Sequence, residues 1–277
     1  MLSSAEIAKR IQAFHTVEDV VSAMKAYAGV TVRKTEEIVP HIREYEKNML
    51  SAVADMVTHY GAGFLEERRK GKRIVAAFGS SVGLCGAFNE KMADAVSNLF
   101  TPGDVLLVVG RRLKSSLDLK HIPYRDYGDS VISINGINAA LRDTLSKIMD
   151  IYGKDGYYDL TFVFTCVIEK GAEILVERIL PPAIDDIPSV KSPPLTYMMP
   201  HVILDHILEE FIYISLYRCY VESLRSENWY RLRSMEGASE SLRKHISELA
   251  SLQRYIGQEE ITEEMIEILG SGMFYGT

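Results

Sequence analysis

Both ends of the chain carry long helical repeats of apolar residues, and this arrangement limits what the rest can fold into. The N-terminal repeat runs through Ile7, Ile11, Phe14, Val17, Val21, Met24 and Ala28, then Ile42, Tyr45, Met49, Val53 and Met56. A second repeat runs from Ile203 to Ile256. Steps of three and four residues place each repeat on one stripe of a helix. A helix of about 50 residues is roughly 75 Å long, so the two helices are predicted to pair as one antiparallel coiled coil.

The first helix contains Pro40, which lacks a backbone donor. A proline inside a helix removes one hydrogen bond and crowds the preceding turn. We therefore expect a kink or a local break at this position.

The middle of the chain has a different period. Short apolar runs predict strands at 73–79, 105–110, 160–165 and 174–180. Helical stretches are expected between them at 87–99, 113–119 and 137–152. Strands that alternate with helices favour a mostly parallel sheet covered on both faces. The predicted fold class is therefore α/β, with a domain at 72–195 inserted between an N-terminal helix at 1–60 and a C-terminal helix at 201–277.

The composition of the chain argues against some classes of function. The chain has 277 residues and a formal net charge of −7, which argues against a nucleic-acid-binding protein. No run of about 18 apolar residues is present, and the start has no signal-peptide pattern. Any work at a membrane is therefore expected to go through a partner.

The three cysteines, Cys85, Cys166 and Cys219, are far apart and odd in number. This usage fits a reducing cytosolic setting and predicts no metal site. Cys166 and Cys219 lie in apolar runs, and we expect both to be buried as small hydrophobic side chains.

A glycine-rich loop at 79–89 follows a predicted strand and precedes a predicted helix. Open α/β sheets often bind phosphate at such a place. The loop has neither the GK[ST] ending of a P-loop nor the GxGxxG spacing, so a structural turn is favoured over a phosphate loop. His201 and His206 are five residues apart and do not share a helix face as metal ligands. We expect no cofactor and no catalysis by this chain itself.

Three segments carry a resemblance to a known family. The first is Ala23-Met24-Lys25-Ala26-Tyr27-Ala28 with Arg33-Lys34, and the second is Gly83-Leu84-Cys85-Gly86-Ala87-Phe88-Asn89. The third joins Ser226-Glu227-Asn228 and Arg233-Ser234-Met235 to a C-terminal stretch at 261–272. In this order the segments resemble the gamma chain of the rotary ATP synthase family, the central-stalk rotor.

The resemblance implies a coiled coil with an inserted Rossmann-like domain, in a hetero-oligomer that couples ATP synthesis to hydrogen ion transport. The coiled coil would stand inside a hexamer of alpha and beta chains, with catalysis on the beta chains. The α/β domain would meet an epsilon-type chain and the ring of c subunits. The chain would then be peripheral, at the cytoplasmic face of a prokaryotic membrane.

Site residues follow from matching positions in the family pattern. The expected contacts with the hexamer are Met24, Lys25, Gln258, Ile261, Thr262 and Glu264. The expected family turn in the inserted domain comprises Gly83, Leu84, Cys85, Gly86 and Asn89.

Some positions depart from the family pattern and indicate a divergent member. Ser81 and Val82 stand where the family has an acidic and a basic residue. Gly257 replaces an arginine beside Gln258, which weakens an expected ion pair with the beta chain.

Two other functions remain open from the residues alone. One is a nucleotide-binding α/β protein with a coiled-coil tether, and the other is a coiled-coil scaffold.

Overall fold

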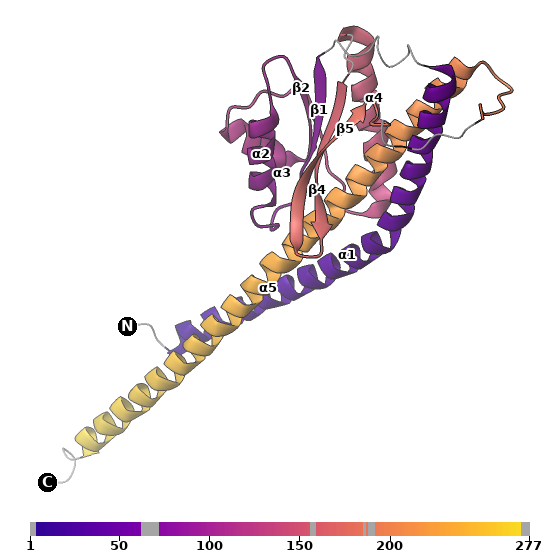
Figure 1. Ribbon diagram of the computed structural model, residues 1–277. Helices are drawn as coiled ribbons and strands as arrows, with labels where there is room; N and C mark the ends of the chain where they lie inside the picture. Colours follow the sequence, from indigo (N-terminus) through magenta and orange to yellow (C-terminus); the bar gives the residue numbers. More distant parts are fainter. Residues whose placement is uncertain (1–3, 62–71, 156–158, 185–186, 188–191, 273–277) are drawn as a thin grey trace. The chain divides into compact units, whose positions relative to one another are not determined.

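The fold is described from a computed structural model covering residues 4–61, 72–155, 159–184, 187 and 192–272 (Figure 1). Two long helices, α1 Ser4–Tyr60 and α5 Pro200–Gly272, confirm the predicted terminal helices. Helix α1 continues through Pro40, so of the kink or local break expected there, the break does not occur. Val39 and Ile42 flank the proline and are buried in the core, and their packing holds the helix together around the missing hydrogen bond. None of the helices in the described part of the chain is long and apolar enough to cross a membrane.

The chain forms two compact units, and both long helices contribute to each. One unit comprises Met1–Tyr27 with Leu232–Thr277, and the other comprises Ala28–Arg231. In the first unit, Lys25 pairs with Glu236 at 3.5 Å, and Glu18 pairs with Arg243 at 3.2 Å. Partner numbers rise in α5 as they fall in α1, so the two helices are antiparallel, as predicted.

The larger unit is built on a five-stranded sheet in the order β3-β2-β1-β4-β5. Its strands are β1 Arg73–Phe78, β2 Val105–Val109, β3 Asp126–Gly128, β4 Asp159–Ile168 and β5 Gly171–Leu180. The first four are paired in parallel, whereas β5 returns antiparallel to β4. All four predicted strands are confirmed, and β3 is an additional one. Its three residues are polar or partly exposed, so it carries no apolar run by which the sequence could reveal it.

Helices cover both faces of this sheet, as the sequence predicted (Figure 1). Helices α2 Phe88–Leu99 and α3 Arg111–Leu119 pack on the face that carries Val75 and Ala77. The opposite face packs against α1, α5 and α4 Ile137–Asp155, which follows the short 3-10 helix η1 Ile134–Gly136.

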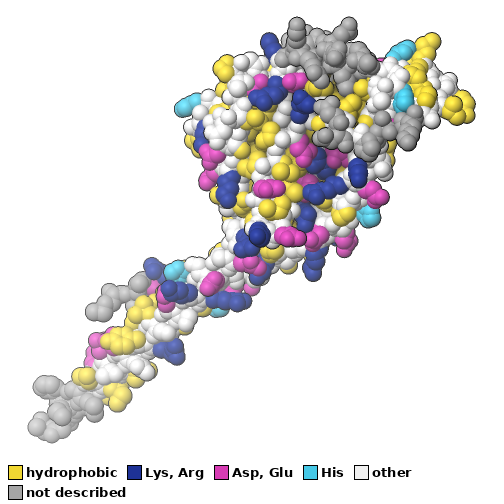
Figure 2. All heavy atoms as spheres, viewed as in Figure 1, with side chains coloured by type: hydrophobic (Ala, Val, Ile, Leu, Met, Phe, Trp, Pro, Cys, Tyr) yellow, Lys and Arg dark blue, Asp and Glu magenta, His cyan; other side chains and the backbone are white. Residues whose placement is uncertain are grey.

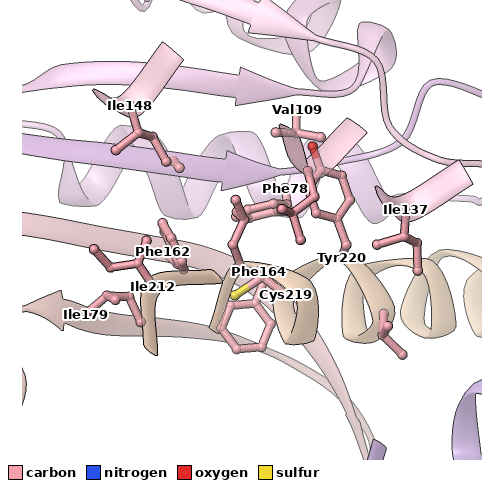
Figure 3. Packing of buried hydrophobic residues seen from close by; sticks show 14 of the residues in the cluster. Phe78, Val109, Ile137, Ile148, Phe162, Phe164, Ile179, Ile212, Cys219 and Tyr220 are labelled. Carbon is pink, nitrogen blue, oxygen red and sulfur yellow. The ribbon is translucent and has the colours of Figure 1, made fainter. Parts of the chain in front are cut away.

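The core between the sheet and α5 is aromatic (Figure 3). Phe78 of β1 makes edge contacts with Phe162 of β4 and with Tyr220 of α5, at ring distances of 5.8 and 5.2 Å. Cys219 lies fully buried beside Tyr220, and Cys166 is also buried, which confirms the prediction for both cysteines. This core fixes one face of α5 against the carboxyl half of the sheet.

Candidate functional site

The central crevice of the sheet lies between β1 and β4. Strands β2 and β3 are added on one side of this pair and β5 on the other, so the direction in which strands are added to the sheet reverses between β1 and β4. Open α/β sheets usually bind ligands outside the carboxyl ends of such strands. Helix α5 covers this place: Ser223 donates to the Phe78 carbonyl at 3.5 Å, and Ser226 donates to the Thr165 carbonyl at 2.7 Å. A buried polar face of the chain's own helix therefore occupies the crevice.

The predicted glycine turn follows β1 and is closed by its own polar groups. The Ser80 amide donates to Asn89 Oδ1 at 2.9 Å, and Asn89 Nδ2 donates back to Ser80 Oγ at 2.8 Å. Cys85 is buried in the turn, 3.5 Å from Ser80 Oγ. Gly86 has a φ of +54°, in the left-handed region that favours glycine. Asn89 and Cys85 thus stabilise the turn from inside, while Leu84 and Gly86 face solvent.

Arg231 connects the glycine turn to α5. Its Nη2 donates to the Gly83 carbonyl at 3.3 Å and to Glu227 Oε1 at 2.5 Å, and its Nη1 donates to Asn228 Oδ1 at 2.9 Å. The turn and the start of the third family-like segment are therefore in direct contact. Reasoning from the sequence missed this contact, although a carboxylate and an arginine four residues apart in an otherwise buried helix were a signal of it.

The crevice contains a buried carboxyl group, that of Glu227, beside the guanidinium group of Arg231. Glu227 is 3% exposed, and its burial raises the pKa of its carboxyl group to about 7, against the opposing pull of the Arg231 guanidinium. A phosphate at this turn would meet this carboxylate and the helix side chains that fill the crevice. The arrangement disfavours the phosphate-loop alternative.

Replacing Glu227 with glutamine is expected to change how stability depends on pH. Between pH 4.5 and about 7 the folded protein keeps a proton that the unfolded chain releases, so this group's contribution to stability falls as pH rises through that window. Across this window the free energy of unfolding falls by up to about 3 kcal/mol because of Glu227. Glu227→Gln has no such proton to release and should not show this loss. Urea unfolding at pH 5 and pH 7.5 measures the difference.

The exposed Glu236→Gln is the control for that experiment, and it should keep the wild-type pH dependence. An unchanged slope in Glu227→Gln would show that this carboxyl group is ionised in the fold well below pH 7.

Further buried charges tie α5 to the other elements of the larger unit. Arg218 pairs with Glu46 of α1 at 2.5 Å and with Glu177 of β5. Glu222, whose side chain is 0% exposed, accepts from Arg43 Nε at 3.1 Å and from Arg43 Nη2 at 2.5 Å. Arg218 and Glu222 thus face α1 and β5, whereas Glu227 and Arg231 face the glycine turn from another side of α5. We call these four residues the buried charged residues of α5, and their pairing was not predicted from the sequence.

The six predicted partner-contact residues all lie in the smaller unit, but they form two separate groups. Met24 is half-buried on α1, and Lys25 pairs there with Glu236 of α5. The other four lie on α5 and are exposed: Gln258, Ile261, Thr262 and Glu264. The Ser4 amide, at the start of α1, contacts Glu260 Oε1 at 3.3 Å, so the second group lies at and beyond the start of α1.

The last turns of α5 carry an apolar surface, and hydrophobic side chains are visible near that end in Figure 2. Ile261, Met265, Ile266 and Ile268 are between 58% and 69% exposed. They alternate with the glutamates of the same turns, including Glu263 and Glu264. This end of α5 is therefore an amphipathic helix with its apolar side chains open to solvent.

Comparison with known proteins identifies the family. A family model described as ATP synthase matches residues 3–273. The chain belongs to the ATP synthase gamma chain family. It is thus a non-catalytic gamma subunit of the central stalk of a rotary ATP synthase, and the resemblance carried by three short segments extends over nearly the whole chain.

Individual relatives are distant but of full length. The ATP synthase gamma chain of Geotalea uraniireducens (strain Rf4) is 26% identical, with 97% of both chains covered. That of Heliobacterium modesticaldum (strain ATCC 51547 / Ice1) is 27% identical, with 98% of both covered. The low identity agrees with the divergence inferred at Ser81, Val82 and Gly257.

Solved structures show the same fold. A chain of the Euglena gracilis mitochondrial ATP synthase, in a structure of OSCP, F1 and the c-ring, matches with a TM-score of 0.66 and 14% identity, covering 98% of this chain and 93% of that one. A chain from the Tetrahymena thermophila mitochondrial ATP synthase central stalk and c-ring matches with a TM-score of 0.59 and 18% identity, covering 79% of this chain and 99% of that one.

Proposed function

We propose that this gamma chain transmits torque between a membrane ring of c subunits and a catalytic hexamer of alpha and beta chains. In this proposal the inserted domain, residues 72–195, contacts the c ring and an epsilon-type chain. The helices at 1–60 and 201–277 stand inside the hexamer. The chain is then a peripheral subunit at the cytoplasmic face of a prokaryotic membrane.

The observation that carries the proposal is the end of α5. Beyond Glu260 the helix continues past the start of α1 with Ile261, Met265 and Ile268 exposed. Contiguous exposed apolar side chains mark an interaction surface. A narrow, asymmetric helix end inside a ring of three catalytic sites would touch each site differently, and nucleotide occupancy would reciprocally favour one angle of the helix.

The proposed hexamer contacts are the six positions matched to the family: Met24, Lys25, Gln258, Ile261, Thr262 and Glu264. The turn residues Gly83, Leu84, Cys85, Gly86 and Asn89 have a different role in the proposal, which is to shape the inserted domain. Exposure of Gln258 and Ile261 supports the first assignment, and the internal hydrogen bonds of the turn support the second.

Co-purification from the native host tests the proposal. A tagged full-length chain should recover alpha-type and beta-type ATPase chains, identified by mass. A chain that ends at Gln258 is the comparison, because it keeps the paired region and loses the exposed end of α5. It should recover less of the hexamer or give a complex with impaired ion pumping. Recovery of the full-length chain alone, or ATP hydrolysis by the pure chain, would contradict the proposal.

Replacing Met24 with lysine should impair coupling more than assembly. The new ammonium group would lie beside Lys25 on a surface proposed to face the hexamer, where it could pair with a carboxylate at some rotor angles only. One exposed ion pair is worth up to about 1 kcal/mol, enough to raise the occupancy of one angle about five-fold. We expect ions pumped per ATP hydrolysed to fall at least about two-fold in reconstituted vesicles.

Met24→Leu keeps the apolar character of the site and should couple normally. Equal coupling by the lysine and leucine variants would remove Met24 from the proposed contact surface.

A further inference from the structure

We propose that Arg231 and Glu227 form a torsional joint that fixes the inserted sheet to α5 and carries torque into that helix. The inference rests on the proposed torque transmission and assigns a positioning role to two of the buried charged residues of α5. All its contacts lie within the unit Ala28–Arg231.

Three hydrogen bonds from α5 hold the two sides of the central crevice, and the joint supplies the one to the glycine turn. On the β1 side, Arg231 donates to the Gly83 carbonyl and Ser223 donates to the Phe78 carbonyl. On the β4 side, Ser226 donates to the Thr165 carbonyl at 2.7 Å. Because these bonds start from side chains away from the helix axis, a twist of the sheet about α5 must stretch them. Apolar contacts lack such direction and resist twisting less.

The glycine turn is closed by its own hydrogen bonds and packed against α5. Its chain is closed between Ser80 and Asn89, and Tyr230, beside Arg231, packs on Phe88 at a ring distance of 5.6 Å. The Gly83 carbonyl is therefore held on a braced loop that continues directly from β1. Force on the sheet reaches Arg231 through this loop.

Stability alone does not account for the buried ion pair. Burial raises the pKa of Glu227, so the ionised carboxylate is costly in this place. Replacement of buried ion pairs by apolar residues is often neutral or stabilising, whereas directional hydrogen bonds specify one orientation. The pair of Glu227 and Arg231 is therefore suited to fixing the orientation of the sheet relative to α5. Beyond Arg231, α5 continues as one unbroken helix, along which torque would pass.

The test is a measurement of torsional stiffness in the assembled complex. The hexamer is immobilised and held with a non-hydrolysable nucleotide, and a bead is attached through a cysteine introduced by Glu90→Cys on the exposed side of α2. Angular fluctuation of the bead reports the stiffness between the sheet and the hexamer. The double variant Glu227→Leu/Arg231→Met should raise the angular variance at least about two-fold while leaving the melting temperature of the chain unchanged.

The matched control is Asp118→Leu/Lys114→Met. This ion pair has the same four-residue spacing but lies within α3 and does not link α3 to α5. It should leave the angular variance at the wild-type value. Arg231→Lys keeps a cation near Glu227 but loses the forked donor, and it should give an intermediate variance.

The joint would be refuted if the double variant and the control gave the same angular variance. If the double variant does not fold, Arg231→Lys decides, and a wild-type angular variance in that variant would refute the joint. Failure of the wild-type chain to assemble with alpha-type and beta-type chains is a separate result. It would refute the proposed torque transmission itself.

Discussion

Replacing Arg43 with methionine is expected to lower the free energy of unfolding by about 4 kcal/mol. The variant leaves the Glu222 carboxylate, which is 0% exposed, without its two hydrogen bonds from Arg43. A buried charge that loses its partner carries the full cost of its removal from water. Urea unfolding of the isolated chain at pH 7.5, followed by circular dichroism, measures the loss.

A second variant separates this explanation from a simple loss of packing. Arg43→Met/Glu222→Leu removes both charges and should recover most of the lost stability, because an apolar pair of similar size can replace a buried ion pair. Arg10→Met, at an exposed position on the same helix, should have little effect. If the double variant were as unstable as Arg43→Met, the unpaired Glu222 carboxylate would not be the cause of the lost stability.

Replacing Gly110 with alanine is expected to destabilise the inserted domain by about 4 kcal/mol. Gly110 lies between β2 and α3 with a φ of +112°, and its amide donates to the Gly128 carbonyl at 2.8 Å. An added Cβ would lie 2.7 Å from the Gly79 carbonyl carbon and from the Ser80 oxygen. Since these are backbone atoms of the glycine turn, they cannot move aside without distorting that turn. The same unfolding measurement applies.

Gly103→Ala distinguishes the clash from the backbone conformation. Gly103 has a similar φ of +108°, but an added Cβ there would have nothing within 4 Å. It should cost about 1 to 2 kcal/mol, the usual cost of a left-handed conformation for a residue with a Cβ. Equal losses in the two variants would mean that the glycine turn can yield to the added atom.

The sequence was sufficient for those parts of the fold that depend on apolar spacing. The long terminal helices and the strands at 73–79 and 160–165 each have a clear period or an apolar run. The strand at Asp126–Gly128 has neither, since only its pairing with β2 defines it. At Pro40 the sequence left a kink and a break open, and burial of the neighbouring Val39 and Ile42 keeps the helix continuous.

The candidate site was harder to predict for a physical reason. Arg218, Glu222, Glu227 and Arg231 are charged residues, and a helical pattern alone assigns charged residues to a solvent-exposed face. Their partners, such as Arg43 of α1 and Gly83 of the glycine turn, are distant in sequence and meet these residues only when α1 and the inserted domain pack against α5. Met24 and Gln258 pose the opposite problem, because a contact with another subunit is defined by that subunit as much as by this chain.

The covering of the sheet's crevice by α5 has a consequence for a machine that works on ATP. Cells change their ratio of ATP to ADP as their metabolic state changes. A rotor subunit with an open nucleotide site would bind more or less nucleotide as that ratio changed. Its elasticity, and the elastic energy that it stores in each step, would then change as well. Because Ser223, Ser226 and Glu227 fill the place where such sheets usually bind a nucleotide, we expect the elasticity of this subunit not to depend on the ratio of ATP to ADP.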